Sequence, residues 1–206
     1  MTVSGKKIKT SMIDGLMFEL TAEILRLRSQ EGSLEAAGKA AVLSNAPSKR
    51  TENSRKRYVT EALSRLRRLT EQETDSFATL SLEDQRLLLW IALCRTYPIV
   101  RRFATELLRD SLLVSKKPVS DGDYNAFFSR LAAEEPVYDQ LSVPYRQKIK
   151  HTIFGAARNA GLLKEDRTVI PAVPSGELCQ AVAGSSPEDL LCLPCDESYI
   201  RRMLQS

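Results

Sequence analysis

The apolar stretch from Leu87 to Cys94 constrains the fold more than any other part of this chain. It is too short to cross a bilayer but long enough for two turns of a helix buried on every side. Ser81 followed by Asp84 predicts the cap of that helix. Pro98 predicts its end, because proline disfavours the helical conformation of the residue before it. We therefore expect a fully buried helix at the centre of the core.

Pro98 can open a second helix, since its missing N–H costs nothing at the first helical position. One face of this helix is apolar and the other is mostly charged. The apolar face comprises Ile99, Val100, Phe103, Ala104, Leu107 and Leu108. With Trp90, the only tryptophan, the two helices are expected to form core and to have no chemistry of their own.

Composition bounds the class of protein. A chain of 206 residues allows one sizeable domain or two small ones that share a core. Contents of 43% hydrophobic and 27% charged residues are ordinary for a soluble globular protein. No run approaches about 20 apolar residues, and the N-terminal lysines precede no apolar run, so neither a membrane span nor a signal peptide is expected. Four unevenly placed cysteines favour a reducing cytoplasm over a disulfide framework.

Positive charge is concentrated in two segments. The net charge is only +4, yet residues 45–70 carry +6 and residues 144–171 carry +4, which leaves −6 for the remainder. Two basic segments on an otherwise acidic protein favour a polyanionic partner, with nucleic acid as the default. The alternative is a pair of solvated helix faces.

The first basic segment lies on the third of three expected helices. They cover Met12–Ser29, Ala36–Leu43 and a stretch from Thr51 or Asn53 to Leu69. Two helices, a short break and a helix with a basic outer face are typical of a helix-turn-helix unit. Any three-helix packing gives the same order, so the basic face is what favours this interpretation. That face carries Asn53, Arg57, Thr60, Ser64 and Arg68, flanked by Lys56 and Arg67.

The second basic segment follows a helix that Ser120 and Asp123 cap. A helix from Ser142 or Val143 to Ala160 is expected to present Gln147, Lys150, His151, Phe154 and Arg158 outward, with Lys148 at its edge. Phe154 on a polar face needs a partner, either the other lobe or a ligand.

Leu162-Leu163 and Thr168–Ile170 are short strand candidates around a polar turn, after Gly161 ends the helix. Lys164 and Arg167 lie near the tip of this turn. A helix followed by a small hairpin is typical of a winged helix, whose hairpin lies against a phosphate backbone. An irregular loop is the alternative. Beyond Pro171 we expect an acidic tail that packs on the body.

Residues that carry catalytic or metal chemistry are scarce. Cys192 and Cys195 form a C-x-x-C with Cys179 upstream, but no second such pair exists to complete a zinc site. His151 is the only histidine, which leaves almost no histidine side chains for a catalytic triad or a His-rich metal centre. Asp121 to Asp123 lacks the later ligands of a calcium loop, and no glycine-rich phosphate loop occurs. We therefore expect a non-enzyme without metal or cofactor.

The segments RLLLWIALCRTYPIVRRFATELLRD and DYNAFFSRLAAEEPVYDQLSVPYRQKIKHTIFGAARNAGLLKEDRTVIP resemble the BrxA family, a small component of the BREX bacteriophage-exclusion systems. The resemblance is strongest over Leu87–Pro171 and fair over Thr51–Leu69. It implies an all-helical protein with helix-turn-helix elements, similar in part to the NusB antitermination fold. It also implies double-stranded DNA binding beside ATPase, methyltransferase and phosphatase-like partners. The contacts that it supports are Arg55, Arg57, Arg146, Lys148 and Lys150.

These observations predict an all-α helical bundle of two lobes with helix-turn-helix-like elements, and a small β-hairpin wing on the second is left open. The lobes would span residues 1–80 and 81–206. The expected function is that of a non-catalytic, cytoplasmic, double-stranded-DNA-binding BREX component with little base specificity. The alternatives are a protein-interaction scaffold within the BREX complex and a NusB-like RNA-binding protein, and the oligomeric state is left open. The expected nucleic-acid contacts are Lys49, Arg50, Arg55, Lys56, Arg57, Arg67, Arg68, Arg146, Lys148, Lys150, His151, Arg158, Lys164 and Arg167.

Overall fold

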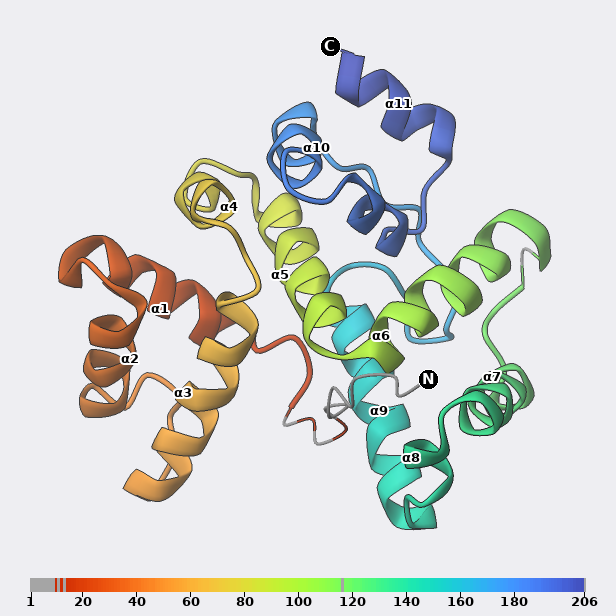
Figure 1. The fold of residues 1–206 in the computed structure, drawn as a ribbon, viewed down its shortest axis with the longest axis horizontal. Coiled ribbons are helices and arrows are strands. Elements are labelled where there is room, and N and C mark those ends of the chain that lie inside the picture. Colours follow the sequence, from red (N-terminus) through yellow and green to blue (C-terminus); the bar gives the residue numbers. More distant parts are fainter. Residues whose placement is uncertain (1–9, 11, 13, 116, 206) are drawn as a thin grey trace, which may run out of the picture.

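Figure 1 shows a computed structural model of the chain, which describes residues 10, 12, 14–115 and 117–205. Helices account for most of these residues. Within these ranges no strand is formed, and the only β pairing is an isolated antiparallel bridge between Leu163 and Val169. The all-α prediction is therefore confirmed.

The first helices group on one side of the molecule (Figure 1). They are α1 (Phe18–Glu31), α2 (Leu34–Leu43), α3 (Glu52–Leu66) and α4 (Glu71–Ser76). Ser33, Thr51 and Thr70 cap α2, α3 and α4, because each hydroxyl accepts a backbone N–H from the first turn. Several helix ends differ from expectation. Helix α1 covers Phe18–Glu31 where Met12–Ser29 was predicted, α2 starts at Leu34 instead of Ala36, and α3 ends at Leu66 instead of Leu69.

The apolar stretch forms α5 (Leu82–Thr96), capped by Ser81 as predicted. Trp90 and Ile91 are fully buried, and so is nearly every side chain from residue 87 to 94. Pro98 is the first residue of α6 (Pro98–Arg102). The helix continues with wider, π-type turns as η1 (Phe103–Leu108) and η2 (Ser111–Ser115). The predicted apolar face is buried throughout, although the spacing gave no sign of the wider turns.

Aromatic side chains join the central helices to α7 (Asp121–Glu134), α8 (Pro136–Asp139) and α9 (Val143–Asn159). Phe103 lies 6.1 Å from Phe127 and 5.3 Å from Phe154, measured between ring centroids. Ser120 and Asp123 form a capping box at the start of α7, as predicted. The short helix α8 was not predicted, and Pro136 is its first residue.

The turn after α9 is smaller than a wing. Gly161 has φ +78°, the left-handed conformation expected of a residue that ends a helix. The Ile170 N–H donates to the Leu162 carbonyl at 2.9 Å, and the Lys164 N–H donates to the Thr168 carbonyl at 3.0 Å. These bonds close a tight turn around the single bridge. The segment is too short to build the two strands that a wing needs.

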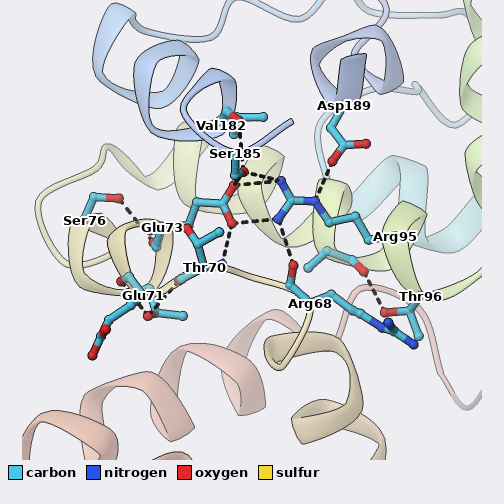
Figure 2. A network of polar contacts seen from close by, with 12 residues as sticks. Arg68, Thr70, Glu71, Glu73, Ser76, Arg95, Thr96, Val182, Ser185 and Asp189 are labelled. Atoms are coloured by element: carbon cyan, nitrogen blue, oxygen red, sulfur yellow. Dashed lines mark hydrogen bonds and ion pairs between the residues drawn. The ribbon is translucent and has the colours of Figure 1, made fainter. Parts of the chain in front are cut away.

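The tail packs on the body, as expected. It comprises α10 (Gly176–Ala183), the 3-10 helix η3 (Pro187–Cys192) and α11 (Glu197–Gln205). The Trp90 Nε1–H donates to the Cys192 carbonyl at 3.0 Å. Figure 2 shows Arg95 of α5 between Glu73 of α4 and Asp189 of η3. Buried polar bonds thus tie the tail to the central helix.

Candidate nucleic-acid interface

Helix α3 presents one polar face to solvent. Val59, Ala62 and Leu66 are buried against the body. Asn53, Arg57 and other side chains of the opposite face are exposed. The direction predicted for this face from the helical repeat is therefore confirmed.

A buried polar cluster fixes α3 to the body. The Arg65 Nη1 donates to the Gly15 carbonyl at 2.6 Å, and its Nε donates to the Glu61 carboxylate at 2.9 Å. The Tyr97 hydroxyl donates to the same carboxylate. Burial and the neighbouring Glu61 raise the pKa of Tyr97, which keeps this hydroxyl protonated as a donor. Because α3 is held by buried groups, its outer face is a rigid platform.

Several cations of the first basic segment are not neutralised by carboxylates. Arg50, Arg57 and Arg68 are exposed, and no carboxylate within the described ranges pairs with them. Lys49 lies over the Tyr58 ring, with Nζ 4.1 Å from its centroid, and the Arg55 Nε donates to the Lys49 carbonyl. These five side chains, Lys49, Arg50, Arg55, Arg57 and Arg68, are called the α3 cations below.

Two further cations of this segment form surface ion pairs. Lys56 lies 2.6 Å from Glu52, and Arg67 lies 3.2 Å from Glu35. All four side chains are at least half exposed. Such pairs are worth little in water, so an incoming phosphate can compete for both cations.

The second basic segment is folded differently from expectation. The prediction that Lys150 and Phe154 project outward is wrong, since both are buried. The Lys150 Nζ lies 2.8 Å from the Asp121 Oδ1. Phe154 packs on Phe103 and lies 5.6 Å from the Tyr124 ring. Helix α7 covers the side of α9 that the helical repeat alone assigned to solvent, so the partner of Phe154 is the protein's own core.

Three more cations of this segment contact the protein itself. Arg167 forms an ion pair with Asp121 and lies over the Phe154 ring, with Cζ 4.8 Å from its centroid. Arg167 does lie in the turn, since its N–H donates to the Lys164 carbonyl, but its side chain folds back onto the protein and is only partly exposed. Arg146 donates to the Leu141 carbonyl at 2.8 Å and lies 3.4 Å from Asp139. Arg158 lies 3.5 Å from Glu165.

Lys148, His151 and Lys164 remain exposed, and the His151 Nδ1 lies 2.9 Å from the Gln147 carbonyl oxygen. The two basic segments are therefore unequal as anion-binding surfaces. The first retains the α3 cations, whereas in the second Lys150 and Arg167 are paired with Asp121, and Arg146 and Arg158 form partly exposed pairs.

Asp121 is the residue whose role the sequence did not reveal. From the sequence it showed only an incomplete calcium-loop pattern, but it pairs with both Lys150 and Arg167. Hydrogen bonds from Lys150 and then from Arg167 lower the pKa of this carboxyl to about 2. Its only sequence signal is a carboxylate beside the capping Ser120, and that signal does not show where the distant cations lie.

The pKa of Asp121 predicts a pH dependence of stability. A carboxyl with a lowered folded pKa stabilises the fold above its unfolded value of 3.8, and this contribution is lost as the pH falls from 3.8 to about 2. Asp121→Asn should therefore have a lower urea midpoint than the parent protein at pH 7. The difference should shrink between pH 4 and pH 2. A difference that stays constant over this range would contradict the assignment.

The cysteines and the acidic groups form no evident metal site. Across residues 14–115 and 117–205 no cluster of three or more His, Cys, Asp or Glu side chains is arranged to hold an ion. Cys179 and Cys195 are buried free thiols, and burial raises the pKa of each to about 11. None of the helices in these ranges has the length and apolar character that a bilayer span requires.

A family model, BrxA, matches residues 9–185. This range includes α1 to α10 and both basic segments, and it ends before η3 and α11. No curated protein matches the chain.

Proposed function

Because the chain belongs to the BrxA family of BREX-associated proteins, we propose that it is the system's non-catalytic binder of double-stranded DNA. The observation that supports this most is the set of α3 cations. Arg55 and Arg57 lie on α3, which buried Arg65 fixes to the body, while Lys49 and Arg50 precede the helix and Arg68 follows it. None of the five forms an ion pair within the described residues. Cations that are not paired with carboxylates are available to neutralise a phosphate backbone.

The mode of binding follows from these side chains. Each lysine or arginine that neutralises a phosphate releases condensed counterions, so affinity should fall steeply with salt. Contacts to phosphates position the protein but read no sequence. We therefore propose backbone recognition by α3 with little base specificity. Lys148, His151 and Lys164 give a second, weaker set of contacts.

Affinity for unrelated duplexes tests this proposal. Two 30-base-pair duplexes of different sequence should bind with dissociation constants that agree within about threefold at equal salt. A base-reading protein would separate them by a factor of ten or more for each mismatched contact. Absence of binding at low salt, or strong preference for one duplex, would overturn the proposal.

RNA binding in the antitermination manner is the rival reading of the same charges. A single-stranded RNA of equal length should compete poorly with duplex DNA, because Tyr58, the one aromatic residue of α3, is only partly exposed and lies under Lys49, so bases have little to stack on. Competition by RNA at a lower concentration than DNA would favour the rival. A scaffold role is supported by a different feature, an apolar groove between α2 and α3.

A further inference from the structure

An apolar groove lies beside the α3 cations, between α2 and α3. Its volume is about 500 Å³, and Val42, Leu43, Val59 and Leu63 contribute its apolar lining. Leu43 is 84% exposed, more than any other large apolar side chain of the described residues. An exposed leucine at the edge of an apolar hollow is unfavourable in water unless something covers it.

The charges around the groove favour one sign of partner. Glu35 and Glu52 are already paired with Arg67 and Lys56 at 3.2 Å and 2.6 Å. Lys39 also lines the groove and is exposed, without a carboxylate partner among the described residues. The rim therefore carries a net positive charge, with Lys39, Lys56 and Arg67 against Glu35 and Glu52. An acidic occupant is attracted to this rim and a basic one is repelled.

The same charges argue against two occupants from this chain. The N-terminal residues 1–9 carry Lys6, Lys7 and Lys9 and no acidic residue. A second copy docked face to face would bring two positively charged rims together. DNA does not fill the groove either, since its apolar lining offers nothing to phosphates.

We propose that this groove binds an amphipathic, acidic helix of another protein of the same BREX system. Two helices enclose the groove, which is the geometry that receives a third helix with apolar side chains at i, i+3, i+4 and i+7. Helix α2 has 10 residues and is about 15 Å long, so a partner segment of about ten residues matches its length. The inference rests on family membership but not on DNA binding.

The test uses each of the other proteins of the BREX system, purified separately and treated with nuclease. One of them should bind the full chain. Leu43→Gln should weaken that binding by about tenfold or more, because the leucine loses its buried apolar contact. The matched control is Val173→Gln, a 70% exposed apolar residue that does not line the groove, and it should stay within twofold of the parent protein. Lys39→Glu should also weaken binding, because it places a negative charge beside the acidic partner helix.

Two further readouts separate the possible outcomes. Hydrogen exchange on the complex should show protection of a helical, acidic segment of the partner, and duplex DNA affinity of Leu43→Gln should equal that of the parent. Failure of every protein to bind, insensitivity to Leu43→Gln, or a protected segment that is not acidic would overturn the proposal. So would a mass of twice 23.1 kDa that Leu43→Gln abolishes, since it would assign the groove to a second copy. If the parent protein did not bind duplex DNA, the proposed function would be refuted, but the proposal for the groove would still stand.

Discussion

Replacing Arg95 by alanine is expected to lower the free energy of unfolding by about 3–5 kcal/mol, the range found when a buried ion pair loses one partner. Arg95 donates twice to Glu73, at 2.7 Å each, and once to Asp189 at 2.6 Å (Figure 2). The Glu73 side chain is fully buried and that of Asp189 is 5% exposed. Without Arg95, the Glu73 carboxylate loses its ion-pair partner in a site that excludes water, and Asp189 retains only Arg101.

Urea unfolding followed by the fluorescence of Trp90 measures this effect. The tryptophan donates to the Cys192 carbonyl in the same tail and should report when the tail detaches. The control is Arg26→Ala, which breaks an exposed pair with Glu23 and should change the urea midpoint far less than Arg95→Ala. A loss below 1 kcal/mol for Arg95→Ala would show that the network does not hold the tail on the body.

Reversing three of the α3 cations is expected to lower affinity for duplex DNA by about a hundredfold or more at low salt. The variant is Arg50→Glu with Arg57→Glu and Arg68→Glu. These arginines are exposed, and their side chains form no hydrogen bond or ion pair with the described residues, so the fold should remain intact. Arg55 is left in place, because its bond to the Lys49 carbonyl stabilises the start of α3.

The control for this variant carries the same change of net charge on other elements. Arg130, Arg201 and Arg202 are exposed on α7 and α11, which lie away from α3 (Figure 1). Their reversal to glutamate should reduce affinity far less, through the general field of the protein alone. Equal losses for both triple variants would mean that net charge, rather than the α3 surface, determines binding. Unchanged thermal unfolding of both variants is required for the comparison.

The local elements could be predicted because their signals are local. Ser81 and Ser120 cap helices as their sequence contexts indicated, since a cap depends on the next three residues. The buried helix around Trp90 was predicted because its run of apolar residues has no polar face to expose. The outward face of α3 was predicted for a related reason: its apolar stripe covers one side only.

The second basic segment could not be predicted in the same way. The helical repeat of α9 gives the directions of its side chains but not which neighbours cover them. Lys150 is buried against Asp121 at the start of α7, and Phe154 is buried against Tyr124 and Phe103. Arg167 turns inward to pair with Asp121, which lies 46 residues earlier in the chain. The groove between α2 and α3 could not be predicted either, because its lining residues Leu43 and Leu63 belong to different helices whose packing the sequence does not give.

The most direct test of DNA binding by the α3 cations is a salt titration of the parent protein on one duplex. With three to five phosphates neutralised by these side chains, the logarithm of the association constant should fall with the logarithm of salt concentration with a slope of about −3 to −5. The variant with Arg50, Arg57 and Arg68 reversed should lose about three phosphate contacts and show a correspondingly flatter line. The account would be contradicted if the parent protein did not bind the duplex at about 50 mM salt, or if its affinity did not change with salt concentration.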